Sequence, residues 1–210
     1  MKYKGMLITF EGGDGAGKST QAELLKNYLT NKGVSVFSTR EPGGTDFSEA
    51  VRALTKDVRF QDKSIISELL LFESARADIV DKKIIPALLE GKVVIMDRFY
   101  DSTTAYQSYG RGMDREMVDK LNLFASQNLV PDITFYMRID PKIAFKRKGG
   151  VEKNDVIELA GLDFHQKVKY GFDCLAKENP NRFVILDSTL PINQVYKTII
   201  KKYEEKLQQK

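Results

Sequence analysis

The chain has 210 residues, of which 42% are hydrophobic and 30% are charged, a balance that excludes a disordered tail or a fibrous repeat. This length predicts one domain, and no break in composition marks a second one. The 33 Lys and Arg residues exceed the 29 Asp and Glu residues by four, too small an excess to indicate a nucleic-acid-binding protein.

Short apolar runs typical of β-strands alternate with longer segments of helical periodicity. The expected strands are residues 6–10, 34–39, 93–96, 133–139 and 183–186. The expected helices are residues 19–29, 63–89 in two pieces, 114–128, 159–177 and 191–206. Strands that alternate with helices favour a parallel sheet covered on both faces. We therefore expect an α/β fold, with a five-stranded parallel sheet flanked by helices, in a single domain over residues 1–210.

A glycine-rich sequence, GGDGAGKS at residues 12–19, follows the first expected strand and fits the pattern G-x-x-x-x-G-K-[ST]. Its glycines let backbone N–H groups converge on phosphate oxygens, and the helix behind it presents its positive N-terminal end. Lys18 can reach the β- and γ-phosphates, and the Ser19 hydroxyl can ligate Mg²⁺. The sequence thus predicts a nucleoside triphosphate site made by Gly12, Gly13, Asp14, Gly15, Ala16, Gly17, Lys18, Ser19 and Thr20.

Two charged residues, Asp97 and Arg98, follow the expected strand at 93–96. In a parallel sheet, the residues just past the strand ends line the ligand crevice, at the edge from which the phosphate loop emerges. Asp97 is therefore expected to hold Mg²⁺ directly or through water. The planar Arg98 side chain suits recognition of a phosphate through two N–H groups.

A second set of residues suits a nucleotide base. Phe72 and Arg76 are spaced i, i+4 and share one face of an expected helix, where they offer a flat apolar surface and a planar donor. A core phenylalanine beside a solvated arginine is the competing interpretation of this pair. Gln107, next to Tyr106 in a polar segment, offers both a donor and an acceptor, which suits a pyrimidine edge.

Together these residues resemble the thymidylate kinase family. The resemblance rests on FEGGDGAGKST at residues 10–20, REPGGT at 40–45, Leu71-Phe72 with Arg76, Asp97-Arg98 and Ala105-Tyr106-Gln107, and it spans nearly the whole chain. It implies a P-loop kinase fold with a mobile lid. It also implies transfer of the ATP γ-phosphoryl group to dTMP, giving dTDP and ADP, with Mg²⁺ and usually in a homodimer.

The resemblance further implies roles for individual residues. Phe72 would stack on thymine, while Arg76 and Gln107 would hydrogen-bond its edge. Arg98 and Arg52 would hold the acceptor phosphate, and Asp14 would approach the deoxyribose 3′-hydroxyl and the phosphates. Tyr106 would lie where a ribose 2′-hydroxyl would intrude. The expected substrate-binding set is Asp14, Glu41, Arg52, Phe72, Arg76, Arg98, Thr103, Tyr106 and Gln107.

The expected lid, at about residues 146–158, departs from the family pattern. Family members usually carry a catalytic arginine in the phosphate loop or in the lid, but this chain has Gly15 at the loop position and DVIE at residues 155–158. We predict that Arg147 closes over the phosphates, assisted by Lys146, Lys148 or Lys153. An ordinary solvated charge run is the competing interpretation. The expected catalytic set is Lys18, Arg98, Asp14 and Arg147.

The remaining signals bear on location and on partners. The single cysteine, Cys174, excludes an internal disulfide and fits a reducing compartment. No signal-peptide pattern is visible, and no run approaches the roughly 20 apolar residues that span a bilayer. We expect a soluble cytoplasmic protein that binds ATP and dTMP, without nucleic acid or membrane. His165 and Cys174 are expected to be structural.

Three other functions stay open at this point. One is another pyrimidine nucleoside monophosphate kinase, acting on dUMP, UMP or CMP. Another is a P-loop ATPase or switch without an acceptor, which would leave Phe72, Arg76, Arg98 and Gln107 without a shared purpose. A third is a catalytically silent homologue that only binds nucleotides. Rates of ADP release across a panel of monophosphates separate these functions.

Overall fold

The computed structural model describes residues 3–149 and 158–208. Five strands in these residues form one parallel sheet in the order β2-β3-β1-β4-β5. The strands are β1 (Met6–Glu11), β2 (Val36–Arg40), β3 (Val93–Asp97), β4 (Ile133–Arg138) and β5 (Phe183–Asp187). The predicted α/β fold with a five-stranded parallel sheet is confirmed, and each strand boundary lies within two residues of its predicted position.

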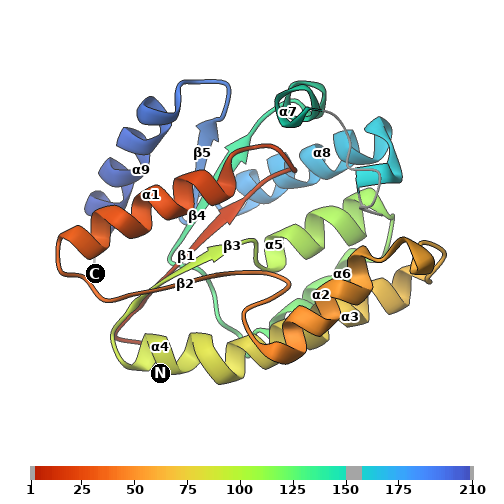
Figure 1. Ribbon diagram of the computed structural model, residues 1–210, viewed down its shortest axis with the longest axis horizontal. Coiled ribbons are helices and arrows are strands. Elements are labelled where there is room, and N and C mark those ends of the chain that lie inside the picture. Colours follow the sequence, from red (N-terminus) through yellow and green to blue (C-terminus); the bar gives the residue numbers. More distant parts are fainter. Residues whose placement is uncertain (1–2, 150–157, 209–210) are drawn as a thin grey trace.

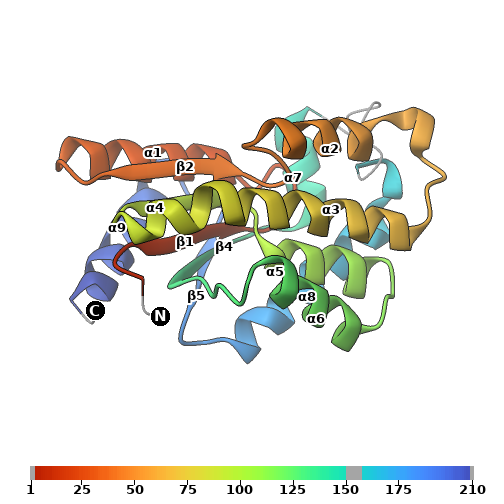
Figure 2. The ribbon, with the colours of Figure 1, turned by 90° about the horizontal axis from the view of Figure 1, so that it is seen from below.

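Helices follow the strands on both faces of the sheet (Figure 1). They are α1 (Lys18–Asn31), α2 (Asp46–Lys56), α3 (Ile65–Ile79), α4 (Ile85–Leu89), α5 (Tyr100–Thr103), α6 (Arg115–Ala125), α7 (Pro141–Lys148), α8 (Leu162–Glu178) and α9 (Ile192–Leu207). Two short 3₁₀ turns, η1 (Val58–Phe60) and η4 (Glu158–Ala160), and two π-helical segments, η2 (Val80–Ile84) and η3 (Thr104–Gly110), complete these connections. Figure 2 shows α3, η2 and α4 as one continuous run along the sheet.

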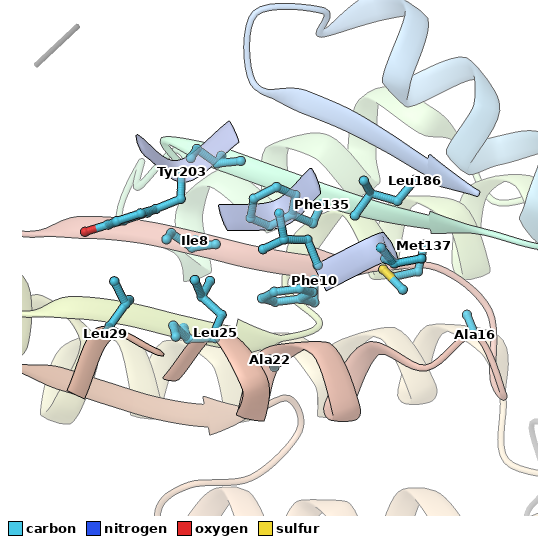
Figure 3. Close-up of a cluster of buried hydrophobic side chains, with 14 of the residues drawn as sticks. Ile8, Phe10, Ala16, Ala22, Leu25, Leu29, Phe135, Met137, Leu186 and Tyr203 are labelled. Carbon is cyan, nitrogen blue, oxygen red and sulfur yellow. The ribbon is translucent and has the colours of Figure 1, made fainter. Parts of the chain in front are cut away.

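The three central strands, β1, β3 and β4, are buried on both faces because they are apolar along most of their length. Helices α1 and α9 cover one face, where Ile8 and Phe10 of β1 pack with Leu25 of α1 and with Tyr203 of α9 (Figure 3). The alternate residue Leu7 points to the opposite face and packs with the α3–α4 run. Packing on both faces thus fixes strand β1, and with it the start of the β1–α1 loop at the carboxyl edge of the sheet.

Three helical segments go beyond the sequence-based prediction. Helix α2 begins after Thr45, whose side chain accepts a hydrogen bond from the backbone N–H of Ser48. Residues 100–110, expected as a polar segment, form the largely buried α5 and η3. Helix α7 includes residues 146–148, the first three residues of the expected lid, so this part of the lid is helical rather than loop. The rest of the expected lid, apart from residues 149 and 158, lies outside the described residues.

Within residues 3–149 and 158–208, no helix combines the length and the apolar character needed to cross a membrane.

Candidate active site

The glycine-rich loop joins the end of β1 to the start of α1, as the sequence predicts. Gly12 and Gly15 have positive φ angles of 131° and 74°. A Cβ atom on Gly12 would lie 2.6 Å from the carbonyl oxygen of Met137, and one on Gly15 would lie 2.6 Å from that of Ala144. Only glycine avoids both the strain and the collision at these positions. The loop is therefore packed tightly against the end of β4 and against α7.

Lys18 folds back over this loop. Its Nζ donates a hydrogen bond to the carbonyl oxygen of Gly13 at 2.8 Å, and the residue is 7% exposed. Burial, together with the nearby Arg98, lowers the pKa of Lys18 to about 8, although Asp97 and Asp14 favour its charged form. An anionic phosphate in the loop would add further negative charge next to the buried ammonium group.

Ser19 and Asp97 form a corner of oxygen ligands beside the loop. Strands β1 and β3 are neighbours, and their register places Asp97 opposite Phe10, next to the start of the loop. The Ser19 Oγ donates a hydrogen bond to Oδ2 of Asp97. Mg²⁺ prefers hard oxygen ligands and is often held by one or two protein oxygens together with phosphate oxygens and water. These two side chains fit that requirement. The described part of the chain contains no group of three or more His, Cys, Asp or Glu side chains suited to a metal.

Arg98 directly follows β3 and points its guanidinium at the loop. Its φ angle is 72°, a left-handed conformation that is uncommon for a residue other than glycine and that often marks functional sites. Nη1 donates to the carbonyl oxygen of Gly12 at 2.9 Å and to Oγ of Ser102 at 3.0 Å. Nη2 donates to Oδ1 of Asp14 at 2.6 Å. The backbone strain and these three hydrogen bonds fix the direction of the side chain.

Asp14 and Tyr106 complete this corner of the site. Burial disfavours the charged form of Asp14, but Arg98 and Lys18 outweigh it and hold the pKa of the Asp14 carboxyl well below its usual range. The Tyr106 hydroxyl donates to Oδ2 of Asp14 at 3.3 Å, and the guanidinium of Arg98 lies 5.2 Å from the centre of the Tyr106 ring. An ionised carboxylate, a guanidinium and a phenol therefore meet where the loop opens.

A cleft of about 300 Å³ joins these groups. It is lined by Asp14, Gly15, Gly17, Lys18, Ser19, Thr20, Arg40, Glu41, Arg52, Asp97 and Arg98. Four of these side chains are cationic, which suits a ligand with several phosphates. The structure thus brings the phosphate loop, the expected metal ligands and both expected phosphate-binding arginines together. Arg40 was not predicted as a site residue, although it immediately precedes Glu41 in the REPGGT motif.

Arg76 lies in a buried polar cluster and is 2% exposed, so the interpretation as a solvated arginine is wrong. Its Nε donates a hydrogen bond to Oε2 of Glu41 at 2.9 Å, and Nη2 lies 2.8 Å from the same oxygen in an ion pair. Nη1 donates to Glu73 at 2.7 Å and to Asn122 at 2.9 Å, and Nη2 donates to Thr103 at 2.8 Å. Each of the three guanidinium nitrogens thus donates at least one hydrogen bond. A base edge here would have to share one of them.

Glu41 also lines the cleft, and its carboxylate is incompletely paired. Burial raises the pKa of Glu41 to about 7, even though the Arg76 guanidinium opposes this shift. Oε1 of Glu41 has no hydrogen-bond partner among the described residues and is enclosed.

The other expected base-binding residues lie near Arg76. Phe72 is half-buried on α3, one turn before Arg76. Gln107 is 1% exposed, and its Nε2 donates to Oε1 of Glu68 at 3.1 Å. Glu68 was not predicted from the sequence. It stands one turn before Phe72, and this i, i+4 spacing is the signal that could have identified it.

Arg147 lies away from this cleft. It stands on α7, and its guanidinium donates to the carbonyl oxygens of Ser188 and Thr189 in the loop between β5 and α9. In the structure it therefore contacts the β5–α9 loop rather than the predicted position over the phosphates. Lys146 is exposed on the same helix. The side chain of Lys148 and the whole of Lys153 lie outside the described residues.

Glu11 supports Arg98 from behind, a role that the sequence analysis did not identify. Its Oε1 accepts the backbone N–H of Phe99 at 2.7 Å, and its Oε2 accepts the Ser102 hydroxyl at 2.5 Å. Burial and the nearby Asp101 raise the pKa of Glu11 to about 8. Because Ser102 also accepts from Arg98, one short chain of hydrogen bonds links Glu11 to the guanidinium.

His165 has the structural environment expected of it. It is 4% exposed and makes edge contacts with the rings of Phe145 and Phe164, at 4.9 and 5.2 Å between centroids. Cys174 is only half-buried, so it is not a fully enclosed core residue.

Comparison of the whole chain with known proteins finds one family to which it is similar. A family model described as thymidylate kinase matches residues 10–199. A thymidylate kinase of Chlorobaculum tepidum is 46% identical over 204 residues, which cover 93% of this chain and 95% of the relative. One of Thermoanaerobacter sp. is 44% identical, with 95% and 99% covered. The crystal structure of thymidylate kinase from Ehrlichia chaffeensis aligns with a TM-score of 0.79 and 40% identity, covering 95% of this chain and 98% of that one.

Proposed function

The chain belongs to the thymidylate kinase family, and on that premise we propose that it transfers the γ-phosphoryl group of ATP to dTMP, giving dTDP and ADP. One observation carries the proposal most directly. A single cleft holds the glycine-rich loop and, facing it, Arg98 and Arg52. Donor and acceptor phosphates bound to these two sets would lie next to one another. Transfer then forms a bond between an acceptor oxygen and the γ-phosphorus while the bond to the bridging oxygen breaks.

The side chains of the cleft suit this reaction. Phosphoryl transfer depends on bringing two anionic groups into line and on stabilising spread negative charge, and it needs little covalent chemistry from the protein. Lys18 supplies charge to the β- and γ-phosphates, and Arg98 supplies it to the acceptor phosphate. We propose that Ser19 and Asp97 hold Mg²⁺, which when bound neutralises charge on the donor phosphates.

On the acceptor side, we propose that the thymine base stacks on Phe72 and meets Gln107 and Arg76 at its edge. Because each nitrogen of Arg76 already donates a hydrogen bond within the protein, this side chain would share a donor with the base, and Thr103 beside it adds a polar contact. Asp14 and Tyr106 would line the sugar, where their contact leaves little space for a 2′-hydroxyl.

On the donor side, two roles for Arg147 are compatible with its position. Closure over the phosphates, as the sequence predicts, requires its guanidinium to leave the carbonyl oxygens of Ser188 and Thr189. The observed contact supports a role next to the adenosine end of ATP instead, because the β5–α9 loop follows a strand at the ligand-binding edge of the sheet.

We further propose that the protein works as a homodimer. Helix α3 packs against both α2 and α6, and these helices expose several large apolar side chains. They include Phe47 and Leu54 on α2, Ile66 and Leu70 on α3, and Phe124 on α6, which is 82% exposed. A second copy of the chain would cover such a face. Leu70→Asp should then convert a dimer to a monomer in analytical ultracentrifugation, and a monomeric wild type would contradict this proposal.

We also propose a single domain over residues 1–210 and a cytoplasmic location. The domain is supported by one sheet that draws strands from residues 6 to 187. The location is supported by the free thiol of Cys174, which suits a reducing compartment.

A panel of monophosphates tests the function. ADP release with ATP and Mg²⁺ is measured for dTMP, dUMP, UMP, dCMP and CMP, with a reaction that lacks any acceptor. We expect dTMP to be fastest and dUMP slower by about 10- to 200-fold, the range for one methyl group in an apolar pocket. Faster turnover of UMP or CMP would replace dTMP as the substrate. If ATP is hydrolysed at the same rate with every acceptor and without one, the protein is an ATPase or a switch. If no ADP is released at all, it is a silent homologue that only binds nucleotides.

Two matched lysine variants on α1 provide a second test of the proposed function. Lys18→Met should abolish dTMP-dependent ADP release because it removes the charge at the phosphates. Lys26→Met changes the same residue type on the solvent side of the helix, where the side chain is 42% exposed, and should leave the rate unchanged.

A further inference from the structure

Two hydrogen bonds join α3 to residues 100–110, one on each side of Phe72. Glu68, Phe72 and Arg76 stand one helical turn apart and therefore share a face of α3. Nη2 of Arg76 donates to Oγ1 of Thr103 at 2.8 Å, and Nε2 of Gln107 donates to Oε1 of Glu68 at 3.1 Å. A base stacked on Phe72, as proposed above, would lie between these two contacts.

Glu68 decides which way the Gln107 amide points. A carboxylate has only acceptors, so the group that faces Glu68 must be the amide nitrogen of Gln107. Glu68 is itself held in place by Arg111, whose Nε and Nη2 donate to its two oxygens at 3.2 Å each. Glu68 and Gln107 are 3% and 1% exposed, so water cannot readily replace a lost contact. Turning the amide over would oppose two acceptors in a buried place, which is costly.

The amide orientation leaves its carbonyl oxygen for the ligand. Among the described residues, Oε1 of Gln107 accepts no hydrogen bond. A base that carries a hydrogen on N3, as thymine and uracil do, can donate it to this oxygen. Cytosine presents a lone pair at N3, so acceptor would face acceptor.

We propose that Glu68 is a positioning residue that sets base selectivity by fixing the Gln107 amide with its carbonyl oxygen toward the base. The proposal rests on the proposed dTMP kinase function and deepens it. Selection against cytosine then depends on a residue that does not itself touch the nucleotide.

The test is Glu68→Gln, because a glutamine at this position can donate as well as accept and so lets the Gln107 amide turn over. The value of kcat/KM is measured for dTMP, dUMP and dCMP, and the inhibition constant of dCMP is measured against dTMP. We expect the preference for dTMP over dCMP to fall by about tenfold or more, the size of one unpaired buried polar group. The preference for dTMP over dUMP should stay within twofold, because both bases carry the N3 hydrogen.

Glu116→Gln on α6 is the matched control, because this glutamate is 76% exposed and should leave every ratio unchanged. If Glu68→Gln slows dTMP, dUMP and dCMP by one common factor, Glu68 is only structural and the proposal is overturned. A wild type that does not phosphorylate dTMP would overturn the proposed function instead. Thermal unfolding shows whether Glu68→Gln folds. If this variant does not fold, the double variant E68Q/R111Q is measured instead, because it removes both charges of the ion pair. We expect the same fall in its preference for dTMP over dCMP.

Discussion

Replacing Arg98 by lysine keeps the charge in the cleft but removes the planar fork. In the wild type, Nη1 and Nη2 reach four groups at once: the carbonyl oxygen of Gly12, Oγ of Ser102, the carboxylate of Asp14 and the hydroxyl of Tyr106, at 2.6–3.3 Å. One ammonium nitrogen cannot occupy the positions of both Nη atoms, so Arg98→Lys loses at least one of these contacts. On the proposed function, it would also lose the two N–H contacts of Arg98 to the acceptor phosphate.

The size of the effect follows from these losses. A hydrogen bond to a charged group contributes about 1.5–3 kcal/mol, and losing one on the protein and one on the phosphate removes about 3–6 kcal/mol from the transition state. At about 1.4 kcal/mol for each tenfold change, kcat/KM for dTMP should fall about 10²- to 10⁴-fold. The conformational free energy of the positive φ angle at residue 98 is the same for lysine as for arginine, so it adds nothing to the effect.

The assay is dTMP-dependent ADP release at saturating ATP, with thermal unfolding measured in parallel. Arg59→Lys is the matched control, because the Arg59 side chain is 79% exposed and should show wild-type rates. A loss of less than about threefold in Arg98→Lys, or a rise confined to the KM for ATP, would refute the assignment of Arg98 to the acceptor phosphate.

Three further predictions concern the donor side. Because burial lowers the pKa of Lys18 to about 8, its charge is present below that pH and lost above it, so kcat/KM for ATP should fall about tenfold per unit above pH 8. A profile that stays flat to pH 9.5 would contradict this. Asp97→Asn should raise the Mg²⁺ concentration for half-maximal rate by at least about tenfold, because it removes a charged ligand, and an unchanged requirement would exclude Asp97 from the metal site. Arg147→Ala should lower kcat more than threefold if Arg147 closes over the phosphates. A rise in the KM for ATP alone would instead place Arg147 at the adenosine end.

Controls for these measurements are available on the same surfaces. Lys142→Ala lies on α7 with Arg147 and is exposed, so it should leave both kcat and KM unchanged. Asp62→Asn removes an exposed carboxylate and should not alter the Mg²⁺ dependence.

The sheet and the phosphate loop were predictable because their signals are local. Buried parallel strands read as continuous apolar runs, and the spacing of Gly12, Gly17 and Lys18 is dictated by contact with phosphate. Two missed helices also carry local signals. Thr45 and Asp140 cap α2 and α7, and Pro141 stands in the first turn of α7. These segments were missed because glycine and proline before α2, and basic residues in α7, read as loop.

The buried polar contacts could not be predicted in the same way. Residues 100–110 were expected only as a polar segment, yet most are buried because partners far along the chain satisfy their polar groups. Arg182 donates to Asp101 from 81 residues away, at 2.6 Å, and Arg76 reaches Glu41 across 35 residues. No local pattern encodes such pairs. The sequence therefore indicated most of the side chains that gather at the site, but not the buried partners of Arg76 or the contact of Glu68 with Gln107.

The strand order β2-β3-β1-β4-β5 places the residues proposed for the acceptor and those proposed for the donor on opposite flanks of the sheet. Segments that follow β2 and β3 carry Arg52, Phe72 and Gln107, whereas segments that follow β4 and β5 carry Arg147 and its carbonyl partners. The loop after the central strand β1 stands between them. On the proposed roles, changes on the first flank would alter the choice of monophosphate and leave most ATP contacts in place. Laboratory evolution aimed at new nucleoside analogues then has its natural target in residues 41–111, with Asp97 and Arg98 kept unchanged.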